Sequence, residues 1–158
     1  VLNNLNSYSN LSLNLSLNLN LNLNLNLNLN LNLNLNLNLL PVFKDFQELP
    51  VWQMAMQIAV DIFALTENLP RKEDYGLTSQ IRRSSLSISD NIAEGFGRQT
   101  SPDKIKFYLY ARGSANEAKS QLIYGNRVGY FENEKVELLT SRIHQVIESL
   151  NKLIKSLR

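Results

Sequence analysis

The amino-acid sequence predicts an all-α protein, an antiparallel up-down-up-down four-helix bundle preceded by a low-complexity Leu-Asn tail. Apolar residues recur at spacings of three and four through most of residues 41–158, the period that gives a helix one apolar face. Short segments rich in Pro, Gly or Asn separate four such stretches, and short connections make successive helices antiparallel neighbours. Residues 41–158 are therefore the predicted bundle domain, which is of ordinary size for one core, and residues 1–40 are the tail.

The tail is a dipeptide repeat in which leucine occupies every odd position from Leu11 to Leu39, with Asn or Ser between. A period of two would scatter leucine around a helix, so the repeat is not expected to join the bundle core. It lacks the basic start and continuous apolar run of a secretory signal, and asparagine at every second position is costly in lipid. We interpret it as a translated tandem repeat, with an adhesive, aggregation-prone tail as the alternative.

The first helix is expected over about residues 50–68. Pro50 suits a first helical turn because its missing N–H has no partner there, and Pro70 stops the helix. The stripe at spacings of three and four consists of Trp52, Ala55, Ala59, Ile62, Thr66 and Leu69, flanked by Val51, Ile58 and Leu65.

The second helix is expected over about residues 75–94, with Gly95 and Gly97 ending it because glycine reaches the left-handed cap conformation without strain. Small side chains make this helix thin, and we interpret them as positions where neighbouring helices pack closely, with simple exposure to water as the alternative. They are Ser84, Ser85, Ser87 and Ser89.

The third helix is expected to begin at Ser101-Pro102-Asp103, which reads as an N-cap, a proline at the first position and an acid against the helix dipole. It is expected to end between residues 125 and 129. Gly113 lies inside it, where glycine costs roughly 1 kcal/mol relative to alanine, so a close contact with another helix is expected there.

The fourth helix is expected to begin at Asn133 as its N-cap. Leucine, isoleucine and valine alternate at spacings of three and four from Val136 to Leu157. This is the cleanest amphipathic pattern in the chain.

Charge and cysteine content narrow the classes of function. The chain has 16 Lys and Arg, 14 Asp and Glu and a net charge of +2, and no charged residue precedes Lys44. A mildly basic domain permits contact with nucleic acid without requiring it. The absence of cysteine removes disulfides and thiol catalysis and fits a reducing, cytoplasmic location.

No catalytic or metal-binding pattern stands out, so we predict a protein that is not an enzyme and needs no cofactor. His144 is the single histidine, and a metal site needs more ligands than that. No serine has a credible base, and no paired carboxylates stand out. The Gly95-Phe96-Gly97 string lacks the preceding strand of a phosphate-binding loop.

Arg82 and Arg83 are the most informative charged residues. Neighbouring positions on a helix point about 100° apart, so the two guanidinium groups are expected in different environments. One interpretation is ion pairing inside the bundle, with Asp90 or Glu94 as acceptor. The other is a nucleic-acid-binding patch on phosphates; its further candidates are Arg98, Lys104, Lys106 and Arg112.

Arg112 falls on the apolar side of the third helix. It is therefore expected to act mainly in the structure, by pairing with Glu94 or Glu117.

Longer strings stand in a fixed order after the tail, among them Phe43-Lys44-Asp45, Val51-Trp52-Gln53, Tyr75-Gly76-Leu77-Thr78-Ser79-Gln80-Ile81-Arg82-Arg83, Asn91-Ile92-Ala93-Glu94-Gly95 and Ala111-Arg112-Gly113-Ser114-Ala115-Asn116-Glu117. In these strings the sequence resembles the four-helix bundle family first named for proteins encoded in intervening sequences of large-subunit ribosomal RNA genes. The resemblance covers residues 42–158 and none of the repeat.

The resemblance implies an up-down bundle that assembles as a ring, most often a homopentamer. It also implies kinship with the accessory variability determinant of diversity-generating retroelements, which binds nucleic acid and a reverse transcriptase. Two positions depart from the family pattern. Ser89 stands where proline is usual, so the second helix is expected to run straighter, and the acidic pattern after the Arg-Gly-Ser string is reduced to Glu117.

Together these observations predict a non-enzymatic oligomeric protein that binds structured RNA, or RNA and DNA, through a basic surface. The alternative is an oligomeric adaptor that binds only protein. A helical enzyme acting on a small molecule ranks third.

Overall fold

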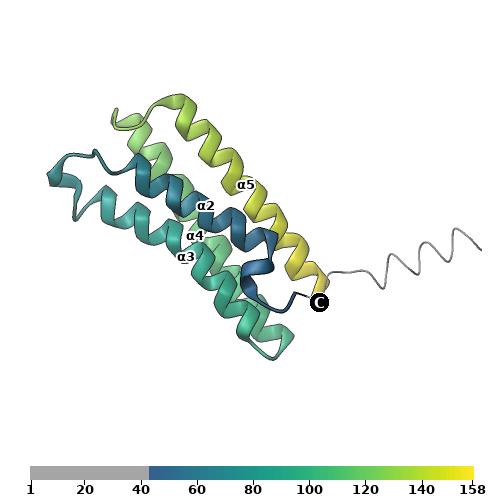
Figure 1. The fold of residues 1–158 in the computed structure, drawn as a ribbon. Helices are drawn as coiled ribbons and strands as arrows, with labels where there is room; N and C mark the ends of the chain where they lie inside the picture. The colour runs from purple at the N-terminus through teal and green to yellow at the C-terminus, as the bar shows by residue number, and fades with distance from the viewer. Residues whose placement is uncertain (1–42) are drawn as a thin grey trace, which may run out of the picture. The chain divides into compact units, whose positions relative to one another are not determined.

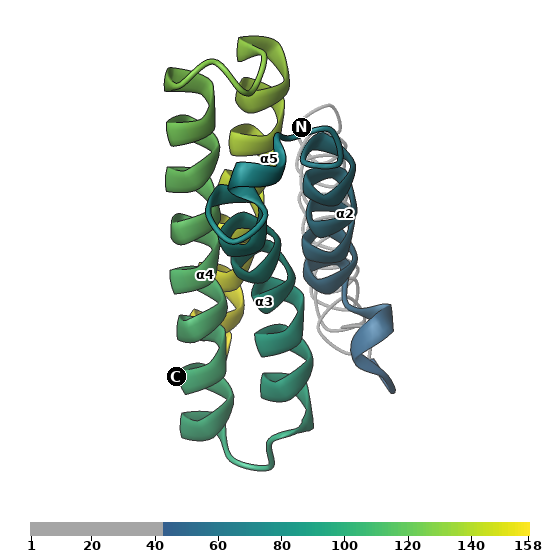
Figure 2. The same cartoon turned by 90° about the vertical axis from the view of Figure 1, so that its left-hand side faces the viewer.

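The computed structural model describes residues 43–158, and the repeat and its predicted properties lie outside the described residues. The described elements are the 3₁₀ turn η1 (Phe46–Glu48), helix α2 (Pro50–Leu65), the 3₁₀ turn η2 (Arg71–Glu73) and helices α3 (Leu77–Gly97), α4 (Ser101–Arg127) and α5 (Asn133–Ser156). The four long helices run alternately up and down, and each packs against its neighbours, with α5 returning to α2 (Figures 1 and 2). The predicted all-α four-helix bundle is confirmed.

The core is built from the apolar stripe that each helix turns inward. A fully buried isoleucine or leucine contributes roughly 1.5–3 kcal/mol relative to exposure, so a handful of such residues accounts for much of the driving force. The largest are Ile58, Ile62, Ile81, Ile88, Ile92, Leu122, Ile143 and Leu150.

Helices α3 and α4 pack closely because small residues line their contact. The Ser84 hydroxyl donates to the Gln121 side chain of α4 at 2.6 Å, and the Ser87 hydroxyl lies 3.0 Å from the Ser114 hydroxyl of α4. Ser85 and Ser89 are also buried, and each donates to a carbonyl of its own helix. A methyl group at Gly95 would lie only 2.6 Å from the Tyr108 ring. The packing interpretation of these serines is therefore confirmed, and α3 is one continuous helix through Ser89.

Predicted boundaries of all four helices differ from the observed ones, beginning with those of α3, α4 and α5. Thr100, not Ser101, is the N-cap of α4, because the Thr100 hydroxyl accepts from the Asp103 N–H at 3.3 Å. Glu132 precedes α5, and Asn133 is the first helical residue. Helix α3 continues past Gly95 to Gly97, since Gly95 serves close packing rather than a helix end.

Helix α2 ends at Leu65, three residues before the expected end. The Thr66 hydroxyl donates to the Ile62 carbonyl at 2.8 Å, so a buried side chain satisfies one of the last carbonyl groups of α2. The Thr66 backbone N–H also donates to that carbonyl, at 3.1 Å, so the hydroxyl supplies a second donor at the end of the helix.

The turn between α4 and α5 depends on two glycines. Gly129 has a φ of +80°, a conformation that side-chain-bearing residues rarely adopt. Gly125 contacts the buried Phe131 ring so closely that a methyl group there would lie 2.3 Å from a ring carbon. The turn is tied to η2 because the Tyr130 hydroxyl donates to the Glu73 carboxylate at 3.0 Å.

Within residues 43–158, none of the helices combines the length and the apolar character that crossing a bilayer requires.

Candidate nucleic-acid interface

Arg82 joins α3 to the end of α2. Its Nε donates to the Thr66 hydroxyl at 2.7 Å and a terminal nitrogen donates to the Phe63 carbonyl at 3.4 Å. The guanidinium also lies over the Phe63 ring, 4.2 Å from its centre. A cation at a helix C-terminus is favourable because the last carbonyl groups carry partial negative charge.

The expected ion pair of Arg82 or Arg83 with Asp90 or Glu94 was wrong, because those acids lie two or more turns further along the same helix. Among the described residues Glu94 pairs instead with Arg98, four positions on, which is the spacing that brings helical side chains together. Arg83 is exposed and donates to the Gln80 side chain at 3.1 Å.

Arg98 and Lys104 lie on either side of the turn between α3 and α4. The Arg98 guanidinium is 4.4 Å from the centre of the Phe107 ring. The Lys104 ammonium donates to the Phe96 carbonyl at 2.8 Å and lies 5.6 Å from the centre of that ring. Lys104 thus caps the end of α3 from the first turn of α4, as a cation should.

Lys106 is exposed on α4 with its ammonium 6.0 Å from the centre of the Tyr110 ring. Arg112 is half-buried and donates to the Asn151 side chain of α5 at 2.8 Å. Its structural contact was expected, but the predicted partners Glu94 and Glu117 were wrong.

The six predicted residues do not form one patch. Because an α-helix rises about 1.5 Å per residue, Arg82 lies about 24 Å from Arg98 along α3. Arg82 and Arg83 therefore lie in the first third of α3, whereas three of the other cations gather at the turn between α3 and α4. That cluster consists of Arg98, Lys104 and Lys106.

Sequence reasoning missed three cations at the end of α5, namely Lys152, Lys155 and Arg158. All three are exposed. Helices α4 and α5 are antiparallel and Arg112 contacts Asn151, so the end of α5 lies at the level of the first turns of α4, as Figure 1 shows. The signal was available, since no acidic residue follows Glu148. We call the surface formed by six cations the basic end. They are Arg98, Lys104, Lys106, Lys152, Lys155 and Arg158.

Acidic groups border the basic end on the α3 side. Asp90 and Glu94 lie beside Gly97 and Arg98 in an open hollow. Partial burial raises the pKa of the Asp90 carboxyl above its ordinary value. Burial also raises the pKa of the Tyr108 hydroxyl, which packs against Gly95.

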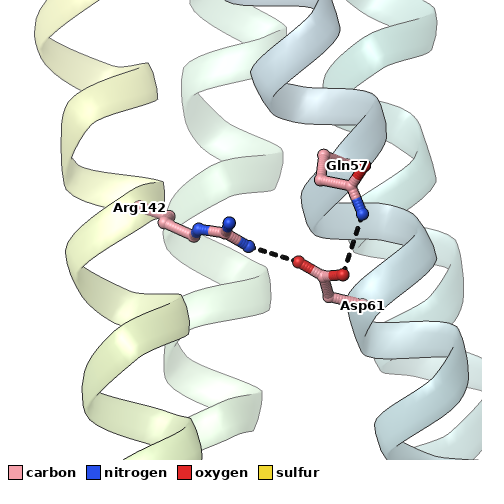
Figure 3. A network of polar contacts seen from close by, with 3 residues as sticks. All are labelled: Gln57, Asp61 and Arg142. Carbon is pink, nitrogen blue, oxygen red and sulfur yellow. Dashed lines mark hydrogen bonds and ion pairs between the residues drawn. The ribbon is translucent and has the colours of Figure 1, made fainter.

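Sequence reasoning also missed a polar link between α2 and α5. Asp61 forms an ion pair with Arg142 and accepts from the Gln57 side chain at 2.9 Å (Figure 3). The two acceptor contacts use different carboxylate oxygens of Asp61. The link holds the last helix of the bundle to the first.

Residues 43–158 contain no group of three His, Cys, Asp or Glu side chains arranged to hold a metal ion. His144 is exposed, and its Nε2 lies 3.4 Å from the Glu148 carboxylate on the next turn of the same helix.

Comparison with known proteins decides the family. The family model described as 23S rRNA-intervening sequence protein matches residues 47–152. The chain belongs to this family.

A crystal structure supports the assignment to the intervening-sequence family. It is of a protein of unknown function from the S23 ribosomal protein family of Bacteroides thetaiotaomicron, with 27% sequence identity and a TM-score of 0.61. The match covers 66% of this chain and 98% of the other. Curated proteins gave no match. The resemblance to the intervening-sequence family, which the sequence strings indicated, is thus confirmed.

Proposed function

We propose that the chain is a non-enzymatic, oligomeric, cytoplasmic protein that binds structured RNA, or RNA and DNA, through the basic end of its bundle. The observation that carries this proposal is the convergence of six cations from α3, α4 and α5 at one end. Clustered cations attract the negatively charged phosphate backbone, and contacts with that backbone dominate affinity for nucleic acid.

Local structure at the basic end adds to the attraction for phosphate. Helix α4 begins there, and the N-terminus of a helix carries partial positive charge. Arg98, Lys104 and Lys106 each lie over an aromatic ring, which holds the cation at the surface. Arg98 also pairs with Glu94, which offsets part of its charge. Several copies in one assembly would multiply a modest patch, because linked weak contacts strengthen one another.

Protein binding alone is the second candidate function. It is favoured by the intramolecular contacts of Arg82 and Arg112, which reduce the cations available to phosphate. Homopentameric assembly and a reverse transcriptase as partner remain predictions from the family resemblance.

The test compares two variants that lose the same charge at opposite ends of the bundle. Lys152→Gln/Lys155→Gln removes two cations from the basic end, and the control Arg71→Gln/Lys72→Gln removes two exposed cations from η2. Fluorescence anisotropy with a structured RNA at several salt concentrations gives affinity and its salt dependence.

We expect the basic-end variant to bind more weakly and its log–log salt slope to flatten by about 0.7–0.9 for each phosphate that is no longer neutralised. The control should bind like the wild type. Equal weakening in both variants would contradict the proposed location. Absence of wild-type binding at low salt would favour the protein-binding adaptor.

A further inference from the structure

Aromatic rings are interleaved with the cations of the basic end along α4. The Phe107 ring lies under the Arg98 guanidinium and meets the Tyr110 ring edge to face, with 5.8 Å between the ring centres and 90° between the planes. The Lys106 ammonium stands beside Tyr110, 6.0 Å from its ring centre. Two rings and two cations therefore form one continuous run on the surface.

Tyr110 is the ring that a ligand can reach most fully. The residue is 50% exposed, whereas Phe107 is half-buried. Phe96, the ring under Lys104, packs against the core of the bundle and so has a structural role.

Gly113 keeps the space beside Tyr110 open. The two residues are three positions apart on α4, so they lie one turn from each other on the same face. A methyl group at Gly113 would meet no atom of a neighbouring element within 4 Å, so the close helix contact expected from the sequence is not made within residues 43–158. Glycine in mid-helix lowers stability, and close approach of a ligand to the backbone beside Tyr110 would account for it.

Stacking distinguishes unpaired bases from paired ones. An unpaired base exposes its flat face, which stacks on aromatic rings and on guanidinium planes, whereas a base inside a duplex has its faces covered by its neighbours. A duplex could therefore use only the cations of the basic end. A single strand could use the cations and Tyr110 together.

Charge sets the direction in which a bound strand leaves Tyr110. Lys106 lies one turn before Tyr110 on α4, toward the turn between α3 and α4. Glu117 lies one turn after Gly113 and is exposed. Phosphates are attracted by the lysine and repelled by the carboxylate, so the strand runs from Tyr110 toward the first turn of α4.

We propose that the basic end binds unpaired nucleotides of RNA or DNA, with a base stacked on Tyr110 and the neighbouring phosphates held by Lys106, Lys104 and Arg98. The inference rests on the proposed function and names its substrate class. That class is single-stranded segments, including the loops and ends of a structured RNA, in preference to duplex.

The test measures binding of the full-length chain by fluorescence anisotropy, with single strands of RNA and of DNA and with duplexes that carry the same number of phosphates. We expect each single strand to bind roughly tenfold more tightly than its duplex at equal salt. Tyr110→Leu should weaken single-strand binding by about the same factor and leave duplex binding unchanged. Its log–log salt slope should match that of the wild type, because no phosphate contact is lost.

Tyr124→Leu is the matched control. Tyr124 is 54% exposed on the same helix and lies about 21 Å from Tyr110 along the helix axis, so this variant should bind like the wild type. Tyr110→Phe keeps the ring and should also bind like the wild type, which separates stacking from a hydrogen bond of the hydroxyl.

Three results would overturn the inference while leaving the basic end in place. They are equal affinity for single strands and duplexes, wild-type binding of single strands by Tyr110→Leu, and equal weakening of single-strand and duplex binding by that variant, which would show a structural role of Tyr110. Absence of binding to every nucleic acid at low salt would overturn the proposed function and the inference together.

Discussion

Arg82 and Arg83 are neighbours in sequence that have different physical roles in the subunit. Arg82 donates to the buried Thr66 hydroxyl and covers the Phe63 ring, whereas Arg83 is exposed. We expect Arg82→Ala to lower the free energy of unfolding by about 1–2 kcal/mol, because it removes a hydrogen bond from a charged donor and the cation over the ring. Arg83→Ala should change it by less than about 0.5 kcal/mol.

Urea unfolding followed by circular dichroism, at one protein concentration, measures both variants. Arg82→Lys serves as a control, since lysine keeps the charge but lacks the fork of donors that reaches Thr66 and Phe63 together. Equal destabilisation by Arg82→Ala and Arg83→Ala would show that the contacts of Arg82 contribute no net stability.

The sequence predicted that Arg82 and Arg83 lie in different environments, but it did not predict which residues they contact. Helical geometry separates adjacent side chains by about 100°, and that is local information. Thr66 reaches Arg82 only because α2 ends where it does and the η2 segment folds the chain back. The pairing of Glu94 with Arg98 needed no tertiary information, since their spacing of four predicts it.

At the scale of the element, the Asp61–Arg142 link between α2 and α5 is the most testable contact. The two side chains are 31% and 43% exposed, so water and salt screen the pair. A double-mutant cycle with Asp61→Ala and Arg142→Ala should give a coupling free energy of about 0.2–1 kcal/mol, and the coupling should shrink as salt is raised.

A suitable reference cycle uses Lys135→Ala and Glu132→Ala, an exposed ion pair at the start of α5 whose nitrogen and oxygen are 3.2 Å apart. That pair should couple no more strongly than Asp61 and Arg142, because it joins residues of one local segment and closes no contact between helices. Coupling of Asp61 with Arg142 that persists unchanged in high salt would contradict the screened, surface character of the pair.

Helices as elements could be predicted from their stripes, but their ends could not. In α5 the apolar spacing from Val136 onward fixed the helix and its buried face. Thr100 and Ser101 are both good capping residues, and only the hydrogen bond to the Asp103 N–H distinguishes them. The cations at the end of α5 were overlooked for a similar reason, because their significance depends on the antiparallel arrangement that places them beside α4.

At the scale of the whole molecule, the buried core and the exposed apolar side chains lie in different parts of the bundle. The inward stripes of all four helices bury one another, and Gly113 and Phe63 face outward. Sequence patterns predict the first property well, because one helix period defines an inward face. They do not predict which outward apolar residues share a surface, since that depends on the register between α3 and α4.

Deletion of residues 1–40 tests whether the bundle domain is independent of the repeat. The apolar stripes of residues 43–158 satisfy one another, and a period of two does not match a helical core. We therefore expect the truncated chain to keep the helicity and melting temperature of the full-length protein. Its solubility should increase, because an uncharged Leu-Asn repeat without proline favours aggregation. Circular dichroism during heating measures the first two properties, and loss of a cooperative transition after truncation would show that the repeat contributes to the folded core.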